Sequence, residues 1–221
     1  MLQGKQRLLQ LNAKLAETLA SKGVTATADE TTTSLVNKVG DIASGDTIYF
    51  SNDGRMHTKS IILPEGISTV GWNSYKDCTK LESVIIPVGV KSIEQSAFQN
   101  CINLKKCIIG HGVNSISINA FYKCNNLEVL FLPNTITAMH TYCYLTSSAK
   151  LTEVVLEDGF NYSLILSAST RYSRETIVSW LNALADRTGQ TAYKLTIGAK
   201  NLAKLTEEDI LIATNKNWTL A

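Results

Sequence analysis

Cysteine and histidine are the side chains here that most readily bind metal ions or act in catalysis, so their spacing is informative. The three histidines, His57, His111 and His140, are too scattered for the H-E-x-x-H pair of a metalloprotease. The sequence has no C-x-x-C motif for a structural zinc site. We therefore expect a chain with no metal, no cofactor and no enzymatic activity.

Three of the five cysteines, Cys78, Cys101 and Cys124, follow one another at intervals of 23 residues. Neighbouring strands of a stacked array lie roughly 5 Å apart, near the Cα spacing of a disulfide, so a bond between them is sterically allowed. Free cysteine is also among the most often buried residue types. We favour buried thiols that pack as small apolar residues, and Cys107, at an inward strand position, fits the same interpretation.

A G-x-G motif and an acidic run are the other features with possible chemistry. Gly110-His111-Gly112 follows an apolar strand, but it lacks the third glycine and the long helix of a phosphate-binding loop. The acidic run Glu207–Asp209 begins a predicted helix, where negative charge complements the helix dipole. Neither feature predicts an active site.

These residues lie in a repeat of 23 residues. The segment LESVIIP at 81–87 recurs as LKKCIIG at 104–110 and LEVLFLP at 127–133; TKSIILP at 58–64 fits the same register, and LTEVVLE at 151–157 fits after a one-residue insertion near 144–150. Each copy reads L-x-x-L-x-L, which is typical of a leucine-rich repeat strand. Between strands, each repeat carries a small residue and an aromatic one, which suits a stacked core. In the last copy, Tyr144 or Leu145 could fill the aromatic position, and Ser147 or Ser148 that of the cysteine.

The composite pattern I-x-x-x-A-F-x-x-C-x-x-L-x-x-I-x-I-P resembles the BspA-like, or Treponema pallidum-type, leucine-rich repeat of bacterial proteins. The resemblance covers about residues 58–160. It implies an α/β solenoid with parallel strands on one face, and a non-catalytic module that binds protein or glycan at a cell surface.

The composition of the flanks differs from that of the repeats, and we divide the chain at 1–45, 46–160 and 161–221. Leucines at helical spacing predict a helical hairpin in the first unit, either a cap on the solenoid or a docking module. In the last unit we expect a helix at 173–185, a strand at 193–197, a helix capped by Thr206 and a strand at 217–220, which together form an α/β cap. The tract NLAKLTEEDILIATNKNWTL at 201–220 resembles units that close bacterial and prophage-encoded repeat proteins, and the N-terminal hairpin resembles helical modules of phage tail-associated proteins. The alternative function is therefore a prophage or phage tail component, structural or receptor-binding.

One outward position of the predicted strands is apolar in every repeat, and we take it as the candidate binding surface. The residues at this position are Ile62, Ile85, Ile108, Phe131 and Val155. Charged residues flank it: Lys106, Glu128 and Glu153. Such a stripe exposes on the order of 100 to 200 Å², less than marks a binding site alone, and β-branched residues favour strands in any case. Binding of a ligand and simple strand preference both remain possible.

The charge balance limits the partners. Among 221 residues, 21 Lys and Arg oppose 19 Asp and Glu, giving a formal net charge of +2 without a basic block. We therefore expect no nucleic-acid partner. The absence of a long apolar run predicts no membrane insertion. We expect an extracellular or cell-surface protein if a leader was removed, and otherwise a virion-associated or cytoplasmic one. A homo-oligomer could form through the N-terminal hairpin or the strand face.

Overall fold

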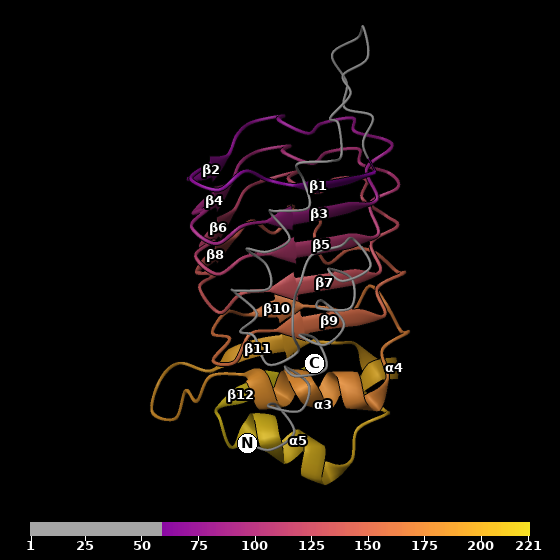
Figure 1. Ribbon diagram of the computed structural model, residues 1–221. Coiled ribbons are helices and arrows are strands. Elements are labelled where there is room, and N and C mark those ends of the chain that lie inside the picture. Colours follow the sequence, from indigo (N-terminus) through magenta and orange to yellow (C-terminus); the bar gives the residue numbers. More distant parts are fainter. Residues whose placement is uncertain (1–58) are drawn as a thin grey trace, which may run out of the picture.

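The computed structural model describes residues 59–221, and its largest element is a parallel sheet of five strands. The predicted N-terminal hairpin of residues 1–45 and the start of the repeat unit lie outside the described residues. The strands are β1 (Ser60–Ile62), β3 (Ser83–Ile86), β5 (Lys106–Ile109), β7 (Val129–Leu132) and β9 (Glu153–Leu156), stacked in that order (Figure 1). They pair in the register of the repeat, Ser60 with Ser83 and Ser83 with Lys106.

A second parallel sheet runs beside the first. Its strands have two residues each: β2 (Thr69–Val70), β4 (Ser92–Ile93), β6 (Ser115–Ile116) and β8 (Ala138–Met139). A proline or glycine corner joins each long strand to the short strand that follows it (Figure 1). One turn of the chain through both sheets, hereafter a rung, therefore corresponds to one sequence repeat, as expected for a leucine-rich repeat solenoid.

The core lies between the two sheets. It is built from columns of side chains, each column formed by one position of the repeat in successive rungs. The inward strand residues Val84, Cys107 and Leu130 are each 0% exposed. Behind them, the rings of Tyr75, Phe98 and Phe121 form a parallel stack, with 5.2 Å between the centroids of each neighbouring pair. A single rung buries its apolar side chains only against its neighbours, so stability depends on the stack as a whole.

Two corners in each of the first three rungs have a positive φ. They fall at Asn73, Ser96 and Asn119 and again four residues later, at Asp77, Asn100 and Lys123. Asparagine and aspartate tolerate the left-handed region better than most residues, because their short polar side chains bond to nearby backbone. The repeat therefore encodes its corners as well as its core.

The C-terminal unit leaves the 23-residue register and adds helices to short parallel strands. Its elements are β10 (Leu164–Ile165), α3 (Arg174–Ala183), β11 (Tyr193–Thr196), α4 (Ala199–Leu202), α5 (Glu207–Thr214) and β12 (Trp218–Leu220), with the strands in the order β10-β11-β12. Helix α3 lies directly below β9 (Figure 1), and the indole N–H of Trp180 donates to the carbonyl of Val154 at 2.7 Å. This helix covers the last strand of the large sheet.

A tyrosine hydroxyl ends the second sheet. The Tyr162 hydroxyl accepts a hydrogen bond from the backbone N–H of Met139 at 3.1 Å and donates one to the carbonyl of the same residue at 3.2 Å. It thus pairs both backbone groups of the final residue of β8.

The structure confirms the predicted elements of the C-terminal unit, with slightly shifted bounds. Ser173 caps α3 as its side chain accepts from the N–H of Thr176, and Thr206 forms a capping box with Asp209 at the start of α5. Strands β11 and β12 lie within the predicted 193–197 and 217–220. The sequence analysis did not predict β10 and α4, which have two and four residues.

Candidate functional site

The apolar residues predicted on the strand face form one continuous column. Strand pairing places Ile62 beside Ile85, Ile85 beside Ile108, Ile108 beside Phe131 and Phe131 beside Val155. Ile85 is buried at 7% exposure, whereas the other four are half-buried. The column is therefore better packed than an open row of apolar side chains. We refer to it as the apolar column.

The second outward column of the same strands is mixed. It contains Ser60, Ser83, Lys106, Val129 and Glu153, all in register. The predicted flanking residues Lys106 and Glu153 thus stand two positions before the apolar column on their strands, and both are half-buried.

Glu128, the third predicted flanking residue, precedes β7 in a column of alternating charge. One rung earlier, Lys105 lies 3.1 Å from the Glu82 carboxylate, and Lys59 lies 3.4 Å from it on the other side. The hydrogen bond and positive charge of Lys105, together with the charge of Lys59, lower the pKa of Glu82. Charge therefore alternates along the edge where the strands begin.

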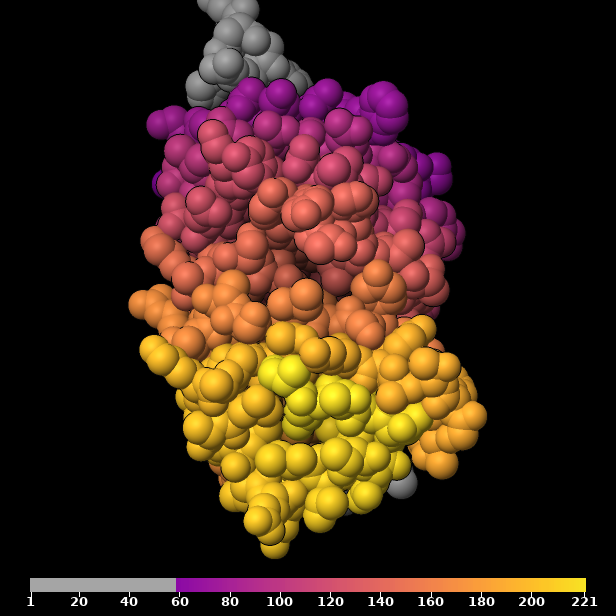
Figure 2. Space-filling model, turned by 180° about the vertical axis from the view of Figure 1, so that it is seen from behind, coloured from indigo at the N-terminus to yellow at the C-terminus, as the bar shows by residue number. Residues whose placement is uncertain are grey.

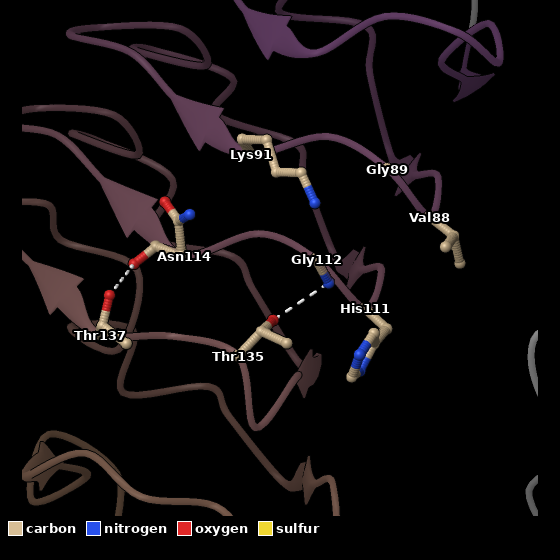
Figure 3. A pocket seen from close by; sticks show the side chains of 8 residues that line it. All are labelled: Val88, Gly89, Lys91, His111, Gly112, Asn114, Thr135 and Thr137. Carbon is tan, nitrogen blue, oxygen red and sulfur yellow. Dashed lines mark hydrogen bonds between the residues drawn. The ribbon is translucent and has the colours of Figure 1, made fainter.

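An open groove of about 470 Å³ crosses the corners between the two sheets (Figure 3). Lys91, His111, Asn114 and Thr137 are among the residues that line it. Its walls are already bonded: the Gly112 N–H donates to the Thr135 hydroxyl at 3.0 Å, and His111 Nδ1 lies 3.0 Å from the Glu157 carboxylate. The sequence did not predict this groove: its residues recur at equivalent positions of three rungs, as Lys91, Asn114 and Thr137 do, but only the fold shows that they line a groove.

All five cysteines are buried thiols and none of them forms a disulfide, which confirms the prediction of buried thiols over disulfide bonds. The three cysteines at intervals of 23 residues are called the ladder cysteines here. Two of them donate to carbonyl groups: Cys101 Sγ to that of Tyr75 at 3.1 Å and Cys124 Sγ to that of Phe98 at 3.2 Å. Burial raises the pKa of the Cys107 and Cys143 thiols, so they are poor nucleophiles at neutral pH.

Within residues 59–221, no group of three or more His, Cys, Asp or Glu side chains could hold a metal ion. In the same described part of the chain, none of the helices combines the length and the apolar character needed to cross a bilayer.

The order of the strands, their register and the 23-residue spacing point to one type of repeat. A family model described as the BspA type leucine rich repeat region matches residues 48–164, more than half of the chain, in 6 copies. The chain belongs to the BspA-type leucine-rich repeat family. The family model thus finds one copy more in this BspA-type protein than the five that its strand motif predicts.

Solved structures with a similar fold include other bacterial leucine-rich repeat proteins. T. pallidum TpLRR is 16% identical over 81% of this BspA-type chain and 96% of its own, with a TM-score of 0.45. The pneumococcal vaccine antigen PcpA is 17% identical over 80% of this chain and 47% of its own, with a TM-score of 0.49. A Bacteroides capillosus leucine-rich repeat protein is 19% identical over 50% of this chain and 92% of its own, with a TM-score of 0.40.

No curated protein matches this BspA-type chain. The chain spans about half the length of the pneumococcal antigen. None of the comparisons bears on the resemblance of the flanks to phage tail-associated proteins, and that resemblance stays a prediction.

Proposed function

We propose that this BspA-type protein is a non-catalytic binding module, and that its strand face recognises a protein or glycan at a cell surface. The observation that carries the proposal is the apolar column, which runs unbroken through five paired strands. Membership of a repeat family supports a binding role in general, because stacked repeats present extended surfaces.

The contrast between the two outward columns argues against strand preference as the sole cause of the apolar column. Both columns lie on the same strands, so a preference for β-branched residues would act on both. The second column instead contains two serines, a lysine and a glutamate among its five residues. The apolar character is confined to one line of the surface, and a ligand-binding role explains that restriction.

The test is a double variant of the two half-buried central residues, Ile108→Ser and Phe131→Ser. The full chain and the variant are compared on a printed panel of glycans and extracellular proteins. The matched control is Ile165→Ser, which removes an equally apolar side chain that is 57% exposed on β10. We expect the double variant to lose at least tenfold in affinity and the control to bind as the natural chain does.

Two results would contradict the proposal. The first is equal binding by the double variant and the natural chain at unchanged thermal stability. The second is an oligomer that becomes a monomer in the double variant, measured by light scattering after size exclusion, because the apolar column then serves a second copy of this chain.

A further inference from the structure

The backbone hydrogen bonds place the one-residue insertion of the last repeat between Cys143 and Ser148. In the earlier rungs, the N–H of the aromatic residue donates to the small residue one rung later, as Phe98 does to Ala120, and Phe121 donates in the same way to Cys143. At the next corner of the core, Leu145 is 1% exposed and is the large apolar side chain buried after Cys143. The N–H of Leu151 donates to Ser148, as that of Leu127 does to Cys124.

Burial decides which residue is left over: Leu145 fills the buried position of Phe121, and Tyr144 is half-buried outside the core. Cys143 takes the place of Ala120, Leu145 that of Phe121, and Ser148 that of Cys124. The extra residue stands between Cys143 and Leu145, with a φ of 63°. A bulky residue in the left-handed region is strained, and such strain is concentrated at functional sites.

The inserted ring completes a group of aromatic side chains on the surface. The ring of Tyr144 lies 4.9 Å from that of Tyr122 and 6.3 Å from that of Tyr142, centroid to centroid. Tyr142 is 58% exposed, and the other two are half-buried. We call Tyr122, Tyr142 and Tyr144 the tyrosine cluster. The equivalent position to Tyr122 is Lys76 and then Gln99 in the two earlier rungs, so the aromatic character is local.

The cluster faces away from the strand face. Figure 2 shows the molecule from behind the five-stranded sheet, where salmon-coloured residues, the colour of this stretch of sequence, stand out above a hollow. The segment 140–146 follows the second sheet and so belongs to this side of the rung. The cluster is therefore a surface separate from the apolar column, and the inference does not rest on the proposed function.

The chemistry of the cluster suits a carbohydrate. An aromatic ring has a negative face, which attracts the slightly positive C–H groups on the flat side of a pyranose. Within residues 59–221, the hydroxyls of the three tyrosines make no hydrogen bond, so they can bond to sugar hydroxyls. The Lys123 ammonium, 5.6 Å from the Tyr122 centroid, adds a further donor at the margin. We propose that the tyrosine cluster binds pyranose rings of a neutral glycan.

The size and the border of the cluster favour a glycan over a protein partner. A specific protein interface takes about 20 to 30 residues on each side, whereas three rings match a few sugar units. The exposed neighbours His140 and Thr141 are polar rather than aliphatic. The ring of His140 lies 5.9 Å from that of Tyr142 and its Nδ1 accepts from the Tyr142 N–H at 3.1 Å, which holds that loop in place.

The experiment measures binding of five hexaoses to the full chain by saturation-transfer NMR and titration calorimetry. The hexaoses are cellohexaose, maltohexaose, mannohexaose, xylohexaose and chitohexaose. The variants are Tyr142→Ala and Tyr144→Asn. Asparagine tolerates the positive φ, so Tyr144→Asn removes the ring without loss of stability. Tyr142→Phe keeps the ring, and Trp72→Ala removes an unrelated aromatic residue that is 71% exposed.

We expect at least one hexaose to bind, with at least tenfold weaker binding for Tyr142→Ala and Tyr144→Asn. Tyr142→Phe should stay within about threefold of the natural chain, and Trp72→Ala should be unchanged. Binding of none of the hexaoses overturns the proposal, as does a loss shared equally by Trp72→Ala. A protein ligand that is lost in Tyr142→Ala, with no sugar bound, would replace the glycan by a protein partner.

Discussion

The buried cysteines lie in two kinds of environment, the corners of the rungs and the middle of a strand. Cys101 and Cys124 donate to carbonyl oxygens of the preceding rung, and at the last corner Ser148 donates to the carbonyl of Asn125 at 3.0 Å. Cys107 instead lies in the middle of β5, 0% exposed, with an apolar residue on each neighbouring strand. Thiols at the corners are therefore polar donors, and the strand thiol is a packing group.

Cysteine-to-serine substitution should separate these two roles. We expect Cys124→Ser to change the free energy of unfolding by less than about 1 kcal/mol, because the hydroxyl can donate to the same carbonyl. Cys107→Ser should cost about 1–3 kcal/mol, because it buries a hydroxyl among apolar side chains. Denaturation with urea measures both, and equal losses would show that the corner hydrogen bond is unimportant.

Gly110 stands where two neighbouring rungs carry Pro87 and Pro133, and its conformation does not explain the choice. The reason is space: a Cβ at Gly110 would lie 2.6 Å from the carbonyl oxygen of Ile86. Because that oxygen also accepts the Gly110 N–H at 2.8 Å, the backbone cannot move away without losing a bond.

We therefore expect Gly110→Ala to destabilise the chain by about 1–3 kcal/mol, as overpacking does. Gly71→Ala is the matched control, since its Cβ would meet only the Ser74 side-chain oxygen, at 3.2 Å. The midpoint of thermal unfolding compares the two, and a similar small shift for both would contradict the steric argument.

The residue pattern predicts columns well and the insertion poorly. Columns follow from the 23-residue spacing alone, because each position is repeated and the alternation of a strand fixes which side chains point inward. The spacing does not say which residue is extra between Cys143 and Lys150, since either Tyr144 or Leu145 fits an apolar site. The burial of Leu145 and the partial exposure of Tyr144 decide this in the folded chain, and so the tyrosine cluster was not predicted.

At the scale of elements, hydrogen bonds in the first turn of α5 fix its start and join it to α3. The Asp209 carboxylate accepts from the Thr206 N–H at 2.9 Å and from Arg174 of α3 at 2.7 and 2.8 Å. Burial would raise the pKa of Asp209, but the hydrogen bonds of Thr206 and Arg174 outweigh it and lower the pKa. One carboxylate therefore begins a helix and joins two helices.

Asp209→Ala should lower the free energy of unfolding by about 1–3 kcal/mol at neutral pH. The pKa of Asp209 is lower in the folded chain than in the unfolded one, so its contribution is present above the ordinary aspartate pKa of about 3.9 and is lost as pH falls through the folded value. The loss caused by the substitution should therefore shrink in acid. Urea denaturation between pH 7 and pH 3 tests this.

Glu208→Ala is the control for that experiment. It removes an exposed carboxylate from the same first turn without touching Arg174 or the cap. A loss as large as that of Asp209→Ala would assign the effect to helix-dipole charge alone.

In the C-terminal unit, the sequence predicted those elements that are long enough to show a periodic or capping pattern. Helix α3 has ten residues, and the start of α5 has a capping box, both of which leave a pattern in the sequence. Strand β10 and helix α4 are only about one period long in the pattern that would predict them, so their pairing and packing decide their conformation.

At the scale of the whole molecule, the rungs form a one-dimensional stack in which the core side chains of each pack against the neighbouring rungs. Trp180 is 0% exposed, packs edge-on against Tyr172 at 4.7 Å and donates to β9. The C-terminal unit therefore transmits its stability to the rest of the array through the last strand.

We expect Trp180→Phe to weaken the array from one end, because it leaves the Val154 carbonyl without its donor. Hydrogen exchange followed by mass spectrometry should show a large loss of protection in β9, a smaller one in β7 and little change in β3. Trp72→Phe, at an exposed site, is the control. A uniform loss across all strands would show that the described residues unfold as one unit.

The Tyr162 hydroxyl has a consequence for solubility. Parallel strands that end with free N–H and C=O groups are templates on which a further chain can polymerise, and a regular stack of two-residue strands is such a template. A single phenol occupies the donor and the acceptor that the next strand of a growing fibre would need. At this end of the second sheet, one oxygen atom thus takes the place of a further strand, and Met139 offers it no unpaired backbone group.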